Sequence, residues 1–263
     1  MNIKGSTALV TGANRGLGRA FVQALLAAGA RKVYAAARDP SSIDLPGVTP
    51  LKLDVTNAAD VAAAAALAGD VDLVINNAGI LRGAPLLAGE IDVHAEMETN
   101  FFGTLAVSRA FAPVLKRNGG GALVNVLSVL SWVTLPGSAL YSASKAAAWA
   151  LTNGLRQELR AQDTQVVALH VGYMDTDMVR SVAAPKSDPD EVARRCSMRS
   201  RPATTKSWPT RRRARSRPAC PPNRRFTWAV TPPRQAVTAL VYDVCRVQFA
   251  RQTIEPIDTK EDP

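Results

Sequence analysis

The chain has 263 residues, of which 47% are hydrophobic and 21% charged, enough for one large α/β domain or two small ones. No apolar run approaches the roughly 18 residues that a membrane helix needs, and the first residues lack the apolar segment of a signal peptide. We therefore expect a cytoplasmic protein without a membrane partner. The formal net charge is +10, but residues 1–193 carry 16 Lys and Arg against 17 Asp and Glu, whereas residues 194–263 carry 16 against 5.

Short apolar segments alternate with helical segments along residues 1–193. The sequence predicts strands at 7–10, 32–37, 51–53, 71–75, 122–127 and 166–171, and helices at 17–30, 58–68, 102–117 and 142–162. The strands are apolar throughout, which is typical of a parallel sheet that is covered on both faces. This order predicts a single α/β domain with a doubly wound parallel sheet, Rossmann-like, which binds ligands at the carboxyl ends of its strands.

A glycine-rich turn, Thr11-Gly12-Ala13-Asn14-Arg15-Gly16-Leu17-Gly18, joins the first strand to the first helix. Glycines let the backbone approach a pyrophosphate, and the amide groups and dipole of the following helix favour its negative charge. The alternative is that the glycines are needed only for the conformation of the strand-to-helix turn, without any ligand. The turn therefore indicates a dinucleotide site only in combination with further motifs.

Three further motifs follow in order: Asn76-Asn77-Ala78-Gly79, Ser128, and Tyr141-x-x-x-Lys145. Together with the glycine turn they resemble the short-chain dehydrogenase/reductase family, from Lys4 to about Met178. The resemblance implies interconversion of a carbonyl and a hydroxyl group on a small-molecule substrate with a nicotinamide cofactor. It also implies a homodimer or homotetramer, with contacts through helices 102–117 and 142–162.

By this resemblance Tyr141 is the general acid and base, and Lys145 holds the nicotinamide ribose. Their spacing places both side chains on one face of a helix. Lowering the pKa of a phenol from about 10 to about 7 needs ~4 kcal/mol, and an ammonium group ~4 Å away at an effective dielectric constant of ~20 supplies about that much. We therefore expect Lys145 to lower the pKa of Tyr141; the alternative is a Tyr and a Lys that only share a solvated helix face.

Ser128 ends the fifth strand and is expected to hydrogen-bond the substrate oxygen near Tyr141. Ser131 is its rival, for which a turn or cap role is the alternative, and the spacing to Tyr141 favours Ser128. Asn100 resembles the family's fourth catalytic residue, which shapes its helix and holds a water in the proton relay. Helix N-capping is the alternative role for Asn100.

The charges near the second strand predict NADP rather than NAD. Arg38 ends that strand, where an acidic residue would accept the 2′-hydroxyl of NAD, and Arg15 lies inside the glycine turn. Two cations suit the extra phosphate of NADP, although Asp39 weakens the case and solvated arginines are the alternative. The residues expected to contact the cofactor are Thr11, Gly12, Asn14, Arg15, Gly16, Leu17, Gly18, Arg38, Asp54, Val55, Asn77, Ala78, Gly79, Tyr141, Lys145, Gly172 and Thr176.

Some of these positions also have a structural interpretation. Asp54 could cap the helix that follows it, and asparagine after the fourth strand could tie neighbouring strands together. Val171 stands where the family has proline before Gly172, so that the loop with Thr176 is expected to be less rigid. The carboxylates that flank Thr176 are assigned no metal, and no metal site is expected.

Residues 194–263 are predicted to be a basic, Pro- and Arg-rich, disordered tail. They hold nine of the 17 prolines and all three cysteines, whose spacing matches no metal or redox motif. A nucleic-acid arm is one interpretation of the charge, but aromatic residues are sparse and nucleic acid is not the expected partner. A shifted reading frame near Arg195 explains the composition better.

A replaced C-terminal segment would change the function. In the resembled family the segment after the threonine loop covers the substrate. The alternative to an active NADP-dependent oxidoreductase is therefore a nucleotide-binding protein with weak or no activity.

Overall fold

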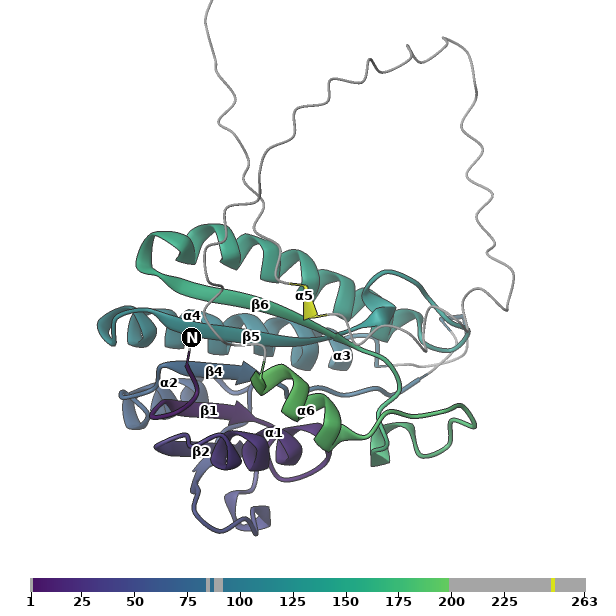
Figure 1. Cartoon of the computed structure of the whole chain (residues 1–263). Coiled ribbons are helices and arrows are strands. Elements are labelled where there is room, and N and C mark those ends of the chain that lie inside the picture. The colour runs from purple at the N-terminus through teal and green to yellow at the C-terminus, as the bar shows by residue number, and fades with distance from the viewer. Residues whose placement is uncertain (1, 84–85, 88–91, 199–246, 249–263) are drawn as a thin grey trace, which may run out of the picture.

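A seven-stranded sheet lies at the centre of the protein, in the order β3-β2-β1-β4-β5-β6-β7 (Figure 1). The computed structural model describes residues 2–83, 86–87, 92–198 and 247–248. The strands are β1 Thr7–Thr11, β2 Lys32–Ala37, β3 Thr49–Lys52, β4 Leu73–Asn76, β5 Gly121–Ser128, β6 Thr164–Val171 and β7 Val247–Gln248. β1 to β6 are parallel and β7 is antiparallel to β6. The predicted α/β fold with a doubly wound parallel sheet is confirmed.

The strands form where the chain is continuously apolar, because helices cover both faces of the sheet. All five residues of β1 are buried, and seven of the eight residues of β5 are buried. β3 lies at the edge and buries only Leu51 of its four residues. The weak apolar signal there explains why the predicted strand is displaced by one or two residues toward the C terminus.

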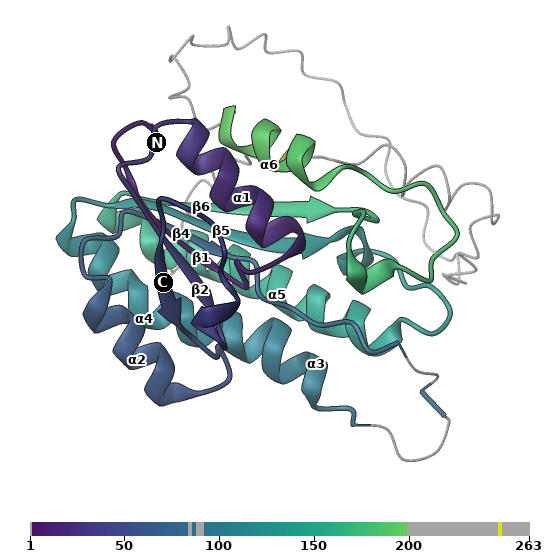
Figure 2. The ribbon, with the colours of Figure 1, turned by 90° about the horizontal axis from the view of Figure 1, so that it is seen from below.

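Helices α1 (Gly16–Ala27) and α6 (Pro189–Met198) lie side by side on one face, and α2 (Ala58–Leu67), α4 (Thr104–Arg117) and α5 (Ala139–Glu158) cover the other (Figure 2). Local signals fix their ends. Asn57 caps α2 by accepting hydrogen bonds from the backbone of Ala59 and Asp60. Gly29, with φ +81°, follows the end of α1 in the left-handed conformation that favours glycine. None of the helices that the structure describes is long and apolar enough to cross a membrane.

The helix before β5 differs from the prediction. It begins with α3 (Ala95–Met97), continues through a π-helical turn at Glu98–Gly103, and only then becomes α4. A Cβ atom at Gly103 would lie 2.6 Å from Cγ2 of Val55, so glycine lets this turn pack against the loop after β3. Short 3-10 turns complete the fold at Pro40–Ser42, Val129–Ser131, Leu159–Gln162 and Asp177–Val179.

The regular structure continues beyond residue 193, where the tail was expected to begin. Val192 and Ala193 are buried in the core between α6, α1 and the sheet. These buried residues stabilise α6, which continues to Met198, and an ion pair between Arg195 and Glu191 joins successive turns of the helix. β7 adds two further residues of the expected tail to the sheet. The rest of the expected tail lies outside the described residues.

Candidate active site

A cavity of about 600 Å³ opens at the carboxyl ends of β1, β2, β4, β5 and β6. Parallel strands end together at this edge, where the strand order reverses between β1 and β4. Every residue predicted for the site lines this cavity except Thr11 and Asn100, which are both 1% exposed and lie directly behind the lining residues.

The glycine turn is held in a conformation that other residues adopt only with strain. Gly12 and Gly16 have φ angles of +63° and +53°. A Cβ atom at Gly18 would lie 2.1 Å from the carbonyl oxygen of Gly12, closer than any real contact. Asn77 fixes the turn from the side, because its Nδ2 donates to the carbonyl oxygens of Thr11 (2.9 Å) and Gly12 (3.2 Å).

This turn fits a dinucleotide pyrophosphate. The first residues of α1 line the cavity, and no side chain caps the N terminus of that helix. Backbone amide groups and the helix dipole therefore remain available for an anion. At Gly18 a side chain would collide with the backbone of Gly12, so the glycine lets α1 pack closely against the end of β1.

Charged side chains lie near the glycine turn, and they differ in whether they already have a partner in the protein. Nη1 of Arg15 lies 3.7 Å from Oδ2 of Asp177, and both side chains are exposed. The carboxylate of Asp39 accepts hydrogen bonds from the backbone and hydroxyl of Ser41, which lower its pKa. Arg38 is exposed and, within the part of the chain that the structure describes, has no ion-pair partner.

Of the two rival serines, Ser128 reaches the cavity. It is 6% exposed at the end of β5, and its Oγ accepts a hydrogen bond of 3.1 Å from the backbone of Leu130. The hydroxyl hydrogen is therefore free to be donated toward the cavity. Ser131 does not line the cavity, and its buried Oγ has no hydrogen-bond partner among the described residues.

Tyr141 and Lys145 both project from α5 toward Ser128 and line the same end of the cavity. Nζ of Lys145 donates a hydrogen bond of 2.9 Å to the carbonyl oxygen of Val126 and lies 5.8 Å from the centre of the Tyr141 ring. Desolvation of the buried ammonium lowers the pKa of Lys145 to about 8.

The pKa of Tyr141 moves in the direction opposite to the one that the sequence predicts. The side chain is partly exposed, but its hydroxyl group is desolvated, and this raises its pKa to about 12. A hydrogen bond with Ser128 offsets part of the rise, and the charge of Glu96 adds to it. The expectation that Lys145 alone lowers the pKa of Tyr141 is wrong for this arrangement, because desolvation of the phenol exceeds the effect of an ammonium group that is bonded to the backbone.

Asn100 occupies the π-helical turn, inside a continuous helical segment, so that it does not cap a helix. Its Nδ2 donates to the carbonyl oxygen of Ile80 and to Oγ of Ser144, both at 2.9 Å, and its Oδ1 accepts from the backbone of Ile80. The side chain thus ties the segment after β4 to α5. A Cβ atom at Gly79 would lie 3.0 Å from Oδ1 of Asn100 and 3.5 Å from Nζ of Lys145, so the glycine lets these two groups converge.

Of the two structural alternatives, the one for the asparagine after β4 holds and the one for Asp54 does not. Asn76 is buried, and its Nδ2 donates to Ser108 and Asn125, which ties β4 to α4 and β5. Asp54 does not cap α2, because Asn57 does so; the carboxylate of Asp54 accepts from the backbone and hydroxyl of Thr56, and Asp54 lines the cavity. No group of His, Cys, Asp or Glu side chains that could hold a metal ion occurs within the described ranges.

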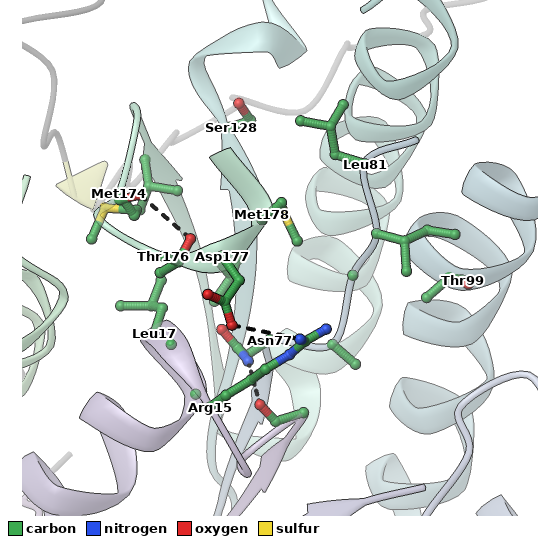
Figure 3. Close-up of a pocket in the computed structure, with 18 of the residues that line it drawn as sticks. Arg15, Leu17, Asn77, Leu81, Thr99, Ser128, Met174, Thr176, Asp177 and Met178 are labelled. Atoms are coloured by element: carbon green, nitrogen blue, oxygen red, sulfur yellow. Dashed lines mark hydrogen bonds and ion pairs between the residues drawn. The ribbon is translucent and has the colours of Figure 1, made fainter. Parts of the chain in front are cut away.

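Sequence reasoning missed Leu81, which lines the cavity, and Glu96, whose charge acts on Tyr141. Leu81, Leu135 and Met178 line the cavity, and Figure 3 shows Leu81 on the side away from Arg15. Glu96 is 3% exposed, and its carboxylate accepts a 2.7 Å hydrogen bond from the backbone of Arg82. Nothing in the sequence distinguishes this carboxylate from a solvated one, because its burial depends on the packing of α3 against α5.

Comparisons with known proteins agree with the geometry. Residues 6–187 match the family described as short chain dehydrogenase. The chain is 36% identical over 203 residues to 1-deoxy-11-beta-hydroxypentalenate dehydrogenase of Streptomyces avermitilis, covering 71% of this chain and 75% of the relative. It is 35% identical over 205 residues to carbonyl reductase [NADPH] 2 of Sus scrofa, covering 76% and 82%.

A solved structure is similar in both fold and sequence. A short chain dehydrogenase from Burkholderia cenocepacia J2315, crystallised in complex with NADP, superposes with a TM-score of 0.71 at 48% identity. The match covers 73% of this chain and 83% of that one.

Proposed function

Since the chain belongs to the short-chain dehydrogenase family and is an oxidoreductase acting on CH–OH and C=O groups, we propose that it reduces an uncharged, apolar ketone or aldehyde with NADPH. The observation that carries the proposal is the convergence of Ser128, Tyr141 and Lys145 at the apolar end of a cavity whose other end is built for a dinucleotide.

The proton chemistry follows from the states of these three side chains. A bound nicotinamide supplies or accepts the hydride. The hydroxyl of Ser128 donates a hydrogen bond to the substrate oxygen and fixes it beside Tyr141. The phenol of Tyr141 gives its proton to that oxygen as the C=O group is reduced, and water reprotonates the phenolate afterwards. A pKa of about 12 keeps the phenol protonated at neutral pH, which is the form that reduction requires.

The ammonium group of Lys145 supports this step in two ways. Its position near the ring of Tyr141 stabilises the phenolate that proton transfer leaves behind. Its remaining hydrogens are available to the ribose hydroxyls, because the structure shows one bond, to the carbonyl oxygen of Val126. Asn100 holds the backbone of Ile80 at the cavity wall, and a relay water beside it stays a prediction.

The choice of NADP rests on Arg38. It follows β2, lines the cavity, and faces no ion-pair partner among the described residues, so its charge is available to a 2′-phosphate. Arg15, in contrast, already faces Asp177. Arg38→Gln should weaken NADPH binding about 10- to 100-fold while leaving NADH binding within about twofold, as followed by nicotinamide fluorescence. Equal losses for both cofactors would contradict this role.

The substrate class rests on the apolar end of the cavity. Leu81, Leu135 and Met178 line the same cavity as Ser128, and the ammonium of Lys145 is assigned to the carbonyl oxygen of Val126 and to the ribose hydroxyls. Burying a substrate carboxylate against such a surface costs several kcal/mol. We therefore expect ethyl benzoylformate to be reduced about 100-fold more efficiently than benzoylformate, which carries the same ketone beside a carboxylate. Leu81→Arg should narrow this ratio, and the neutral Leu81→Gln should not.

The activity itself is tested by NADPH oxidation with a panel of apolar aldehydes and ketones. Wild-type turnover that falls about 100-fold or more in Ser128→Ala, with unchanged NADPH binding, is the expected result. NADPH binding without turnover of any carbonyl would instead favour a nucleotide-binding protein of weak or no activity. Failure to bind NADPH at all would overturn both.

A further inference from the structure

His170 is a fully buried polar side chain that the proposed mechanism does not use. It lies on β6 beside Leu127 of β5, one residue before the register position that pairs Val171 with Ser128. Its side chain is 0% exposed and packs against two tryptophans, which also contact each other. The ring of Trp132 stacks on the imidazole at 4.0 Å between centroids, and the ring of Trp149 meets it edge-on at 5.6 Å.

Within the described ranges the imidazole makes one hydrogen bond, and its partner is the backbone of the proposed catalytic serine. Nδ1 of His170 lies 3.1 Å from the carbonyl oxygen of Ser128. A carbonyl oxygen only accepts, so Nδ1 carries the hydrogen. The buried Nε2 has no partner among the described residues, and it is therefore the unprotonated nitrogen of a neutral ring. Burial also lowers the pKa of His170, in agreement with this state.

The bond from His170 is one of two hydrogen bonds that Ser128 accepts from other described residues. Ser128 has an extended backbone conformation, with φ −140° and ψ 156°, at the point where β5 turns into the next element. Its Oγ accepts from the backbone of Leu130, and its carbonyl oxygen accepts from His170. The carbonyl oxygen and the Oγ of the residue each accept a hydrogen bond from the protein, and the hydroxyl hydrogen remains for Tyr141 and the substrate oxygen.

We propose that His170 is a positioning residue, whose imidazole packs against Trp132 and Trp149 and whose Nδ1–H group holds the Ser128 carbonyl so that the Ser128 hydroxyl stays aimed at the substrate oxygen. The imidazole itself does not line the cavity, so it acts through Ser128 rather than on the substrate. The inference rests on the proposed role of Ser128.

Three substitutions separate the hydrogen bond from the packing. His170→Phe keeps an aromatic ring against the two tryptophans but removes the donor. His170→Asn places an amide donor near the position of Nδ1, whereas the matched His170→Gln places it near that of Nε2. We expect kcat to fall about 10- to 100-fold in His170→Phe and His170→Gln, to stay within about fivefold of wild type in His170→Asn, and NADPH affinity to stay within about twofold in all three.

A double-mutant cycle with Ser128→Ala then asks whether His170 acts through the serine. In the Ser128→Ala background, His170→Phe should change the single-turnover rate by less than about twofold, since there is no hydroxyl left to aim. Equal losses in both backgrounds, or full activity of His170→Phe, would overturn the proposal. If His170→Phe fails to bind NADPH, the Asn and Gln pair decides: equal rates for these two variants would also overturn it. An undiminished rate of Ser128→Ala alone would instead refute the proposed function.

Discussion

Lys145 should cost the protein stability in a way that depends on pH. The side chain is 5% exposed, and desolvation lowers its pKa from the ordinary 10.5 to about 8. Between these two values the unfolded chain binds the proton and the folded chain does not. The free energy of unfolding therefore rises with pH across this window, and the full penalty, about 3 kcal/mol, is present below pH 8.

Lys145→Met removes this titration while keeping a side chain of similar length. From pH 7 to about pH 9.5, the free energy of unfolding of the wild type should rise by about 2 kcal/mol relative to that of the variant. Urea unfolding of both proteins without cofactor, followed by tryptophan fluorescence at each pH, measures the difference. A difference that is constant with pH would show that the ammonium is not desolvated, and a fall would show that the folded state favours the charge.

Two further substitutions test the cavity. Gly18→Ala places a methyl group 2.1 Å from the carbonyl oxygen of Gly12 and should weaken NADPH binding more than about 100-fold. Gly154→Ala, whose methyl group meets nothing within 4 Å, should leave binding unchanged. Equal NADPH affinities of the two variants would contradict the role of the glycine turn in binding. Glu96→Gln keeps the hydrogen-bond acceptor but removes the charge that raises the pKa of Tyr141, so the alkaline loss of reductase activity should move to lower pH. If the pH at which activity falls were unchanged or higher in the variant, Glu96 would not act on the phenol.

The sequence predicts the fold well because the strands and helices follow from local patterns of apolar residues. Continuous apolar runs mark strands that helices cover on both faces, and a motif that follows a strand must lie at the carboxyl edge of a parallel sheet. Ser128 and the glycine turn reach the cavity for this reason. The π-helical turn at Asn100 has no such signal, since its residues favour an ordinary helix equally well.

The electrostatics of the site depend on contacts between distant parts of the chain. The bond of Lys145 to the carbonyl oxygen of Val126 and the burial of Glu96 arise only when α5 packs on β5 and α3. Desolvation then determines the pKa of Tyr141, which spacing along one helix does not reveal. The contact of His170 with Ser128 is likewise a product of strand register.

The proton transfer from Tyr141 is tested most directly by the single-turnover rate of NADPH oxidation with an apolar ketone in Tyr141→Phe. Tyr173→Phe is the matched control, because Tyr173 lines the same cavity. We predict that Tyr141→Phe loses about 10²- to 10⁴-fold in rate with NADPH affinity nearly unchanged, while Tyr173→Phe stays within about tenfold of the wild type. A Tyr141→Phe variant that reduces the ketone at the wild-type rate would contradict the account.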